Sequence, residues 1–169
     1  DLTIVEGTGG TTTAYTFTVT LDEAVQGGFD LAYTTNDGTA TTADSDYVDN
    51  DGTLTFAGTM GETESITVLV NHDTNVEADE TFTVLLGALS NLAAGVDAGD
   101  ITVQGTGGDG VTTNDDWASV TIDDLTIVEG TGGSTTAYTF TVTLDEAVQG
   151  GFDLAYTTND GTGTTSGRD

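Results

Sequence analysis

The sequence contains almost no basic residues. Its 169 residues include 29 Asp or Glu side chains but a single Lys or Arg, Arg168, which gives a formal charge of −28. Because a phosphate backbone requires cationic side chains, this composition excludes nucleic-acid binding, and it excludes attachment to anionic lipid for the same reason. The negative charges also repel one another and so destabilise the compact state. Cations bound at specific sites, or adaptation to high salt, would offset that repulsion.

Cysteine, proline, lysine and long apolar runs are absent as well. Without cysteine there is no disulfide framework. No apolar run approaches the roughly 18 residues of a membrane span, so we expect no insertion into a membrane. The chain has one histidine, no lysine and no serine in a nucleophile-elbow context. The sequence therefore gives no support for catalysis, and we expect a protein that is not an enzyme.

A long internal repeat sets the domain organisation. The decapeptide DLTIVEGTGG begins at Asp1 and again at Asp124, 123 residues later, and the second copy then follows the first with few changes. A period of this length indicates one whole domain per repeat and not one coil of a solenoid. We predict a complete module over residues 1–123. Residues 124–169 would form the first third of a second module, with its first three strands.

Within the first copy, apolar and polar residues alternate with a period of two, which is typical of β-strands. Turn sequences lie between the alternating runs, NDG at 36–38 and DNDG at 49–52. Seven such strands in about 120 residues indicate an all-β, immunoglobulin-like, seven-strand antiparallel sandwich. The connection at 88–116 would contain DITVQ as a candidate edge strand. The predicted strands are residues 2–6, 14–21, 29–35, 52–57, 64–70, 80–87 and 117–122.

Acidic residues gather in loops that this topology would bring to one end of the sandwich. The densest group is NHDTNVEADETF at 71–82. Because like charges at this density oppose folding, we predict that a bound cation neutralises them. Carboxylate oxygens in flexible loops suit calcium better than zinc or magnesium. The predicted ligands are Glu6, Asp46, Asp73, Glu77, Glu80, Asp123 and Asp124.

The run from Asn36 to Leu86 resembles the Calx-beta domain family. DGTA, SDY, GTLTF, GET and EADETF occur in the family's order and near its spacing, with VEG before them and ASVTIDD after them. The resemblance covers residues 1–123 and, as an incomplete copy, 124–169. It implies an immunoglobulin-like sandwich that binds calcium at one end. It also implies the ligands given above, with Asn75 contributing a backbone carbonyl.

The repeat, the charge and the junction TIDDLTIVEG predict a non-catalytic, calcium-binding module of an extracellular stalk, adhesin or filament. The junction leaves almost no linker, so calcium at the module boundary would stiffen the hinge. Expected partners are neighbouring repeats of the same chain, or identical chains that complete the second copy by strand exchange. Two alternatives remain open: a surface or filament repeat whose acidity is salt adaptation, and a calcium-sensor domain like that of the sodium/calcium exchangers.

Overall fold

Threonine-rich alternation produces strands of the sandwich at six of the seven predicted positions. The computed structural model describes residues 1–105, 107–128 and 130–163, and these form β-strands and loops with one 3-10 turn, η1 (Ala98–Asp100). In β2 (Thr12–Thr20), Tyr15 is buried while the flanking threonine Thr16 is exposed, as the pleat of a half-buried strand requires. Nowhere in the described ranges is there a helix long and apolar enough to cross a membrane.

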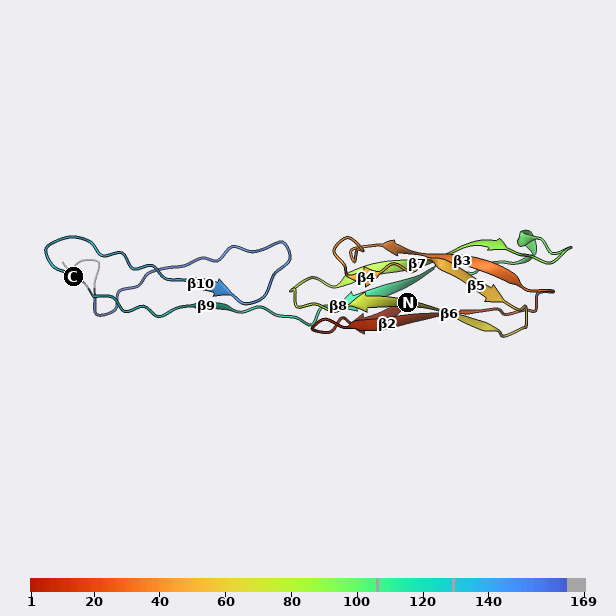
Figure 1. Ribbon diagram of the computed structural model, residues 1–169, viewed down its shortest axis with the longest axis horizontal. Coiled ribbons are helices and arrows are strands. Elements are labelled where there is room, and N and C mark those ends of the chain that lie inside the picture. The colour runs from red at the N-terminus through yellow and green to blue at the C-terminus, as the bar shows by residue number, and fades with distance from the viewer. Residues whose placement is uncertain (106, 129, 164–169) are drawn as a thin grey trace.

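Two sheets pack face to face as an immunoglobulin-like sandwich, so the predicted fold class is confirmed (Figure 1). The pair β1–β8 is parallel and the other pairs of the sandwich are antiparallel. The smaller sheet has the order β2, β6 (Thr63–Asn71), β4 (Tyr47–Val48). The larger sheet has the order β1 (Leu2–Val5), β8 (Gly107–Thr113), β7 (Glu80–Ser90), β3 (Phe29–Asp37), β5 (Gly52–Phe56).

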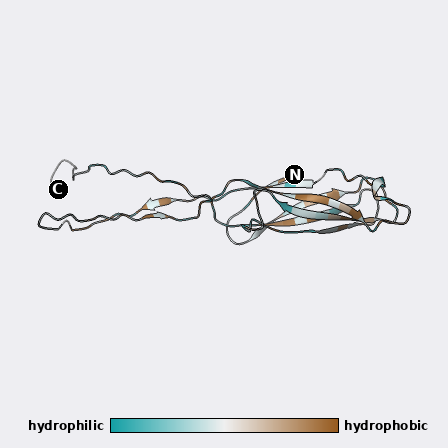
Figure 2. Cartoon of the chain, turned by 90° about the horizontal axis from the view of Figure 1, so that it is seen from above, coloured by the Kyte–Doolittle hydropathy of each residue, from teal (hydrophilic) through white to brown (hydrophobic). Residues whose placement is uncertain are grey.

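The core lies between the two sheets, where apolar segments follow the strands (Figure 2). Its centre is Phe82 on β7, which is 0% exposed. The ring centroid of Phe82 lies 5.4 Å from that of Tyr15, 5.0 Å from that of Tyr47 and 6.2 Å from that of Phe17. Because these rings come from both sheets, Phe82 holds the two layers of the sandwich together.

A glycine-rich strand, β8, closes the sandwich at a place where the sequence analysis expects a loop. A Cβ at Gly110 would lie 2.3 Å from Cζ of Phe82, and a Cβ at Gly108 would lie 2.8 Å from Cδ1 of Phe17. The glycines are required because aromatic rings fill the space of their missing side chains. The candidate edge strand DITVQ, residues 100–104, forms no strand.

Residues 117–122 are not the last strand of the sandwich, contrary to the sequence prediction. Three of them form β9 (Val120–Ile122), which pairs antiparallel with β10 (Val142–Leu144) in an extension at the end of the sandwich (Figure 1). Trp117, expected on that last strand, is 77% exposed. Apolar side chains of the incomplete second copy are exposed as well, among them Phe140, Val142, Phe152 and Tyr156.

Candidate metal centre

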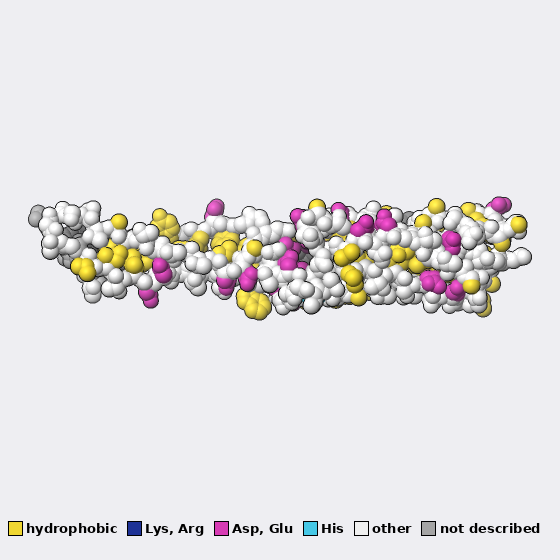
Figure 3. Space-filling view, in the orientation of Figure 1, with side chains coloured by type: hydrophobic (Ala, Val, Ile, Leu, Met, Phe, Trp, Pro, Cys, Tyr) yellow, Lys and Arg dark blue, Asp and Glu magenta, His cyan; other side chains and the backbone are white. Residues whose placement is uncertain are grey.

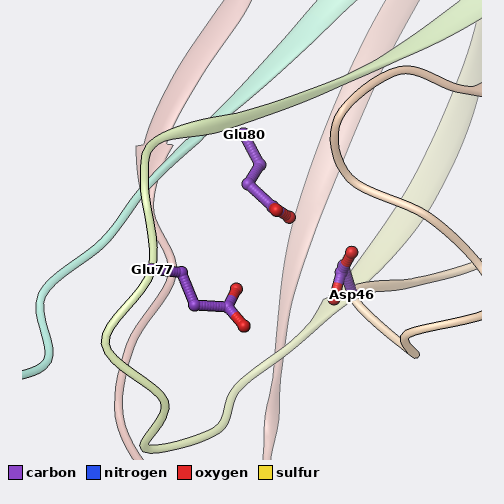
Figure 4. Close-up of side chains that lie close together, drawn as sticks. All are labelled: Asp46, Glu77 and Glu80. Carbon is purple, nitrogen blue, oxygen red and sulfur yellow. The ribbon is translucent and has the colours of Figure 1, made fainter. Parts of the chain in front are cut away.

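Three acidic side chains converge at the end of the sandwich that faces the extension, where carboxylates gather near the middle of the molecule (Figure 3). Asp46 precedes β4, Glu77 lies in the loop between β6 and β7, and Glu80 is the first residue of β7. Ligand oxygens of the three lie within 4.8 Å of one another. The carboxylates point into a common space (Figure 4). This spacing allows one ion to contact all three.

The loop before β4 holds Asp46 in place through its own backbone. The Asp46 Oδ2 accepts a hydrogen bond from the Thr41 N–H at 2.7 Å. The carbonyl of Asp46 accepts from the Asn71 N–H at 2.9 Å, which ties this loop to the end of β6. Ser45 adopts a left-handed conformation with φ of 73°, which turns the chain sharply ahead of Asp46.

Asp73 shapes the loop after β6 and does not lie in the closest group. Its Oδ1 accepts from the Asn75 N–H at 2.7 Å and its Oδ2 from the Asn75 Nδ2 at 3.1 Å, the pattern of an Asx turn. Its carbonyl accepts from the Gly9 N–H at 3.1 Å. The predicted ligand Asn75 therefore sits in a turn that Asp73 fixes, between Asp73 and Glu77.

Glu6 extends the acidic group on the side of β1. Its side chain is only 7% exposed. Burial first, and then the charges of Asp73, Glu77, Asp116 and Asp115, raise the pKa of Glu6 to about 7. Coulombic effects of this order require close approach. Glu6 therefore lies with the three central carboxylates of Asp46, Glu77 and Glu80 in one acidic group at this end of the sandwich. This group is here named the acidic pole.

The central carboxylates also resist ionising together. Burial, followed by the charges of Asp46 and Glu77, raises the pKa of Glu80 to about 7. Burial, then the charges of Asp73 and Asp46, raises the pKa of Glu77. Glu80 is 8% exposed, so water screens this repulsion poorly. A divalent cation in this space would stabilise the ionised forms and reverse the shifts.

Asp115 and Asp116 belong to the acidic pole although the sequence analysis does not select them. They follow β8 after Asn114. The Asp115 Oδ1 accepts from the Gly7 N–H at 2.9 Å. The Asp116 Oδ2 is buried and has no hydrogen-bond partner among the described residues. An unpartnered buried carboxylate oxygen costs free energy, and a bound cation would remove that cost. The sequence NDD at 114–116 could have indicated these two residues, since acids that follow a strand lie at its end. This signal was not used because β8 was not predicted.

The structure does not bring Asp123 and Asp124 to this pole. Asp123 follows β9, and its backbone and side chain bond the backbone of Thr141 in the extension, at 3.1 and 2.7 Å. Asp124 is exposed. Both residues lie in the extension with residues 117–122, because that segment pairs with β10 and not with a strand of the sandwich.

The Calx-beta domain family model matches residues 3–117 and 113–169. Comparison with curated proteins finds no match. Among solved structures, the calcium binding domain CBD12 of CALX1.1 has a TM-score of 0.53 at 24% identity, over 68% of this chain and 41% of its own. The Calx CBD2 domain has a TM-score of 0.51 at 19% identity, over 67% of this chain and 81% of its own.

At these identities the solved structures support the fold. The chain spans less than half of the CBD12 structure of CALX1.1, which is described as a calcium binding domain. The family model, in contrast, covers both copies of the repeat. The chain therefore belongs to the Calx-beta domain family.

Proposed function

We propose that the chain is a non-catalytic, calcium-binding repeat. The observation that carries the proposal is the meeting of Asp46, Glu77 and Glu80 oxygens within 4.8 Å. The buried Asp116 Oδ2, which lacks a partner in the described part of the chain, supports it independently. Hard oxygen donors suit calcium, whereas zinc prefers nitrogen and sulfur. The name of the CALX1.1 calcium binding domain, whose fold is similar, agrees with this choice.

In this proposal Asp46, Glu77 and Glu80 hold the ion. Glu6 and Asp116 contribute charge from the side of β1 and β8, as the effect of Asp116 on the pKa of Glu6 supports. The carbonyl of Asn75 remains a predicted ligand, and Asp73 fixes the turn that presents it. The ion supplies the positive charge that the sequence lacks.

We also propose that the module is part of an extracellular stalk, adhesin or filament at the cell surface. Extracellular modules bind calcium with dissociation constants of about 10⁻⁴ to 10⁻³ M, which suits millimolar surroundings. The sandwich and the extension lie end to end, an arrangement that supports a linear array of repeats (Figure 1). Calcium at the pole between them would stiffen such an array.

Neighbouring repeats of the same chain are the proposed partners. Identical chains are the second candidate, because the exposed Phe140, Val142, Phe152 and Tyr156 form the apolar surface that exchanged strands would cover.

Thermal unfolding tests the calcium proposal. The chain is melted in EDTA, in about 2 mM calcium and in sodium chloride of matched ionic strength. At roughly twentyfold excess over the dissociation constant, calcium alone should raise the melting temperature by roughly 5–10 °C. Glu77→Gln should abolish most of that rise. Glu64→Gln is the control, since Glu64 lies near the start of β6, at the other end of the strand.

Equal stabilisation by sodium chloride would contradict the proposal. It would favour the alternative that the acidity is an adaptation to salt.

A further inference from the structure

A short loop of the second copy docks on the acidic pole of the first. Val148 pairs with Val76 in a parallel bridge. The Val76 N–H donates to the carbonyl of Ala147 at 2.9 Å, and the Gln149 N–H donates to the carbonyl of Val76 at 3.0 Å. Within the described residues 130–163, Val148 is the one side chain that is not exposed. The docking is therefore specific to this loop.

Side chains extend the contact into the candidate metal centre. The Thr74 Oγ1 donates to the Glu146 Oε2 at 2.9 Å. The side chain of Gln149 lies near Glu80, one of the three central carboxylates, and lowers its pKa. Residues 73–77, here named the metal loop, thus contact the second copy through both backbone and side chains.

The docking loop has the same sequence and turn in both copies. DEAVQGG occupies residues 22–28 and again 145–151. The Gly28 N–H donates to the carbonyl of Val25 at 3.2 Å, and in the second copy the Gly151 N–H donates to the carbonyl of Val148 at 3.0 Å. The first glycine of each pair has φ of 77°. The loop is therefore already shaped for docking within a complete module.

In the first copy, this loop leaves free the groups that dock in the second. The Val25 N–H points inward and donates to the carbonyl of Gly58 at 3.0 Å. The carbonyl of Ala24 and the N–H of Gln26 make no hydrogen bond within the described residues, and both residues are exposed. Their counterparts, Ala147 and Gln149, make the two backbone bonds to the metal loop. The Val25 N–H thus bonds within its own module, whereas the carbonyl of Ala24 and the N–H of Gln26 remain available to bond a second module.

We propose that DEAVQGG is the docking element of each repeat and that it forms backbone hydrogen bonds with the metal loop of the preceding repeat. Its glutamine then completes the metal centre of that preceding repeat. The partner is another copy of this module, joined head to tail. The docking loop and the metal loop lie at opposite ends of β2 and β6, which are nine residues long and therefore about 30 Å in length. Each module thus carries one half of the interface at each end. The metal part of this inference rests on the proposed function.

Docking and calcium binding favour each other in this arrangement. Glu146 brings one more carboxylate to the pole, and its charge adds to those of Asp115 and Asp73 around Asp116. Without a cation, docking therefore increases repulsion. With a cation, Glu146 and Gln149 add favourable contacts. By linkage, calcium strengthens docking by the factor with which docking strengthens calcium binding.

A cysteine pair tests the docking in the whole chain, which has no cysteine of its own. Bridge partners on neighbouring strands lie about 5 Å apart, within the range of a disulfide. Val76→Cys with Val148→Cys should form an intrachain disulfide under mild oxidation, faster in calcium than in EDTA. Val76→Cys with Val25→Cys is the matched control, with the same turn at the far end of the module. Equal intrachain linkage in the two variants would overturn the proposal.

Calcium titration of the uncross-linked chain separates the inference from the proposed function. Gln149→Ala should weaken calcium binding about tenfold, and the exposed Gln104→Ala should not. Calcium binding without the Val76–Val148 disulfide would refute the docking and leave the calcium function standing. The disulfide without calcium binding would retain the docking, and would refute the metal centre and the role of Gln149 in it.

Discussion

The carboxylate oxygens of Glu80 and Asp46 lie within 4.8 Å of each other, although Glu80 begins β7 of the larger sheet and Asp46 lies in the loop before β4 of the smaller sheet. Burial, together with the repulsion between two carboxylates this close, disfavours the ionised form of Glu80, so its pKa is raised. In the metal-free protein this pair therefore couples proton binding to the folded state.

Raising the pH should destabilise the metal-free protein. The pKa values of Glu6 and Glu80 rise from 4.5 to about 7 on folding. Between these values the folded state retains protons that the unfolded state has released, so stability falls with rising pH through this window. In EDTA we expect each of the two groups to contribute a loss of roughly 2 kcal/mol between pH 5 and pH 8. Denaturant unfolding at both pH values measures it, and saturating calcium should remove the loss.

Glu80→Gln should act in opposite directions with and without calcium. The neutral amide removes a buried charge from the pole, so the metal-free protein at pH 8 should gain about 1 kcal/mol. The same change removes a ligand, so the stabilisation by calcium should shrink. Paired melting curves in EDTA and calcium give both effects. Glu64→Gln, which also removes one negative charge, should change neither by more than about 0.5 kcal/mol.

Phe82→Ala should destabilise the sandwich by about 3–5 kcal/mol, because it removes a fully buried ring that packs against three others. Trp117→Ala is the control, as it deletes a larger ring that is 77% exposed. It should change the free energy of unfolding by no more than about 0.5 kcal/mol. Urea unfolding of both variants measures the difference. A comparable loss from Trp117→Ala would contradict the placement of that residue outside the core.

Gly58→Ala should disturb the docking loop, because an added Cβ would lie 2.0 Å from the carbonyl oxygen of Val25. Gly61→Ala provides the comparison. Both glycines have positive φ, 89° and 79°, but nothing lies within 4 Å of a Cβ at Gly61. Gly61→Ala should therefore show only the backbone cost of about 1–2 kcal/mol, and Gly58→Ala clearly more. Unfolding free energies of equal size would show that the contact at Val25 relaxes freely.

The period-two pattern predicted the strands that present apolar side chains to the core. It failed for β8, because Gly108 and Gly110 have no side chains to alternate and leave their share of the core to Phe17 and Phe82. It also misassigned residues 117–122. Their apolar and polar residues do alternate, but the strand they form, β9, pairs with β10 of the second copy and not with the sandwich. Local pattern identifies a strand, whereas the choice of partner depends on distant parts of the chain.

The acidic pole was predictable where the acids lie in loops between correctly assigned strands or at the ends of those strands. Glu6, Asp46, Asp73, Glu77 and Glu80 all lie there. Asp115 and Asp116 escaped prediction together with β8. The contact of Gln149 with Glu80 was beyond local reasoning, since no sequence pattern shows how two neighbouring copies meet.

The parallel pairing of β1 with β8 determines how the sandwich bears tension. The chain enters at the Leu2 end of β1 and leaves at the Thr113 end of β8, which are opposite ends of this pair. A pull along the chain therefore shears the two strands past each other and loads their hydrogen bonds at the same time, whereas a hairpin would unzip one bond after another. The hydroxyl of Tyr15, 2.9 Å from the carbonyl oxygen of Ile4 and 3.1 Å from that of Val111, clamps the loaded pair from the opposite sheet.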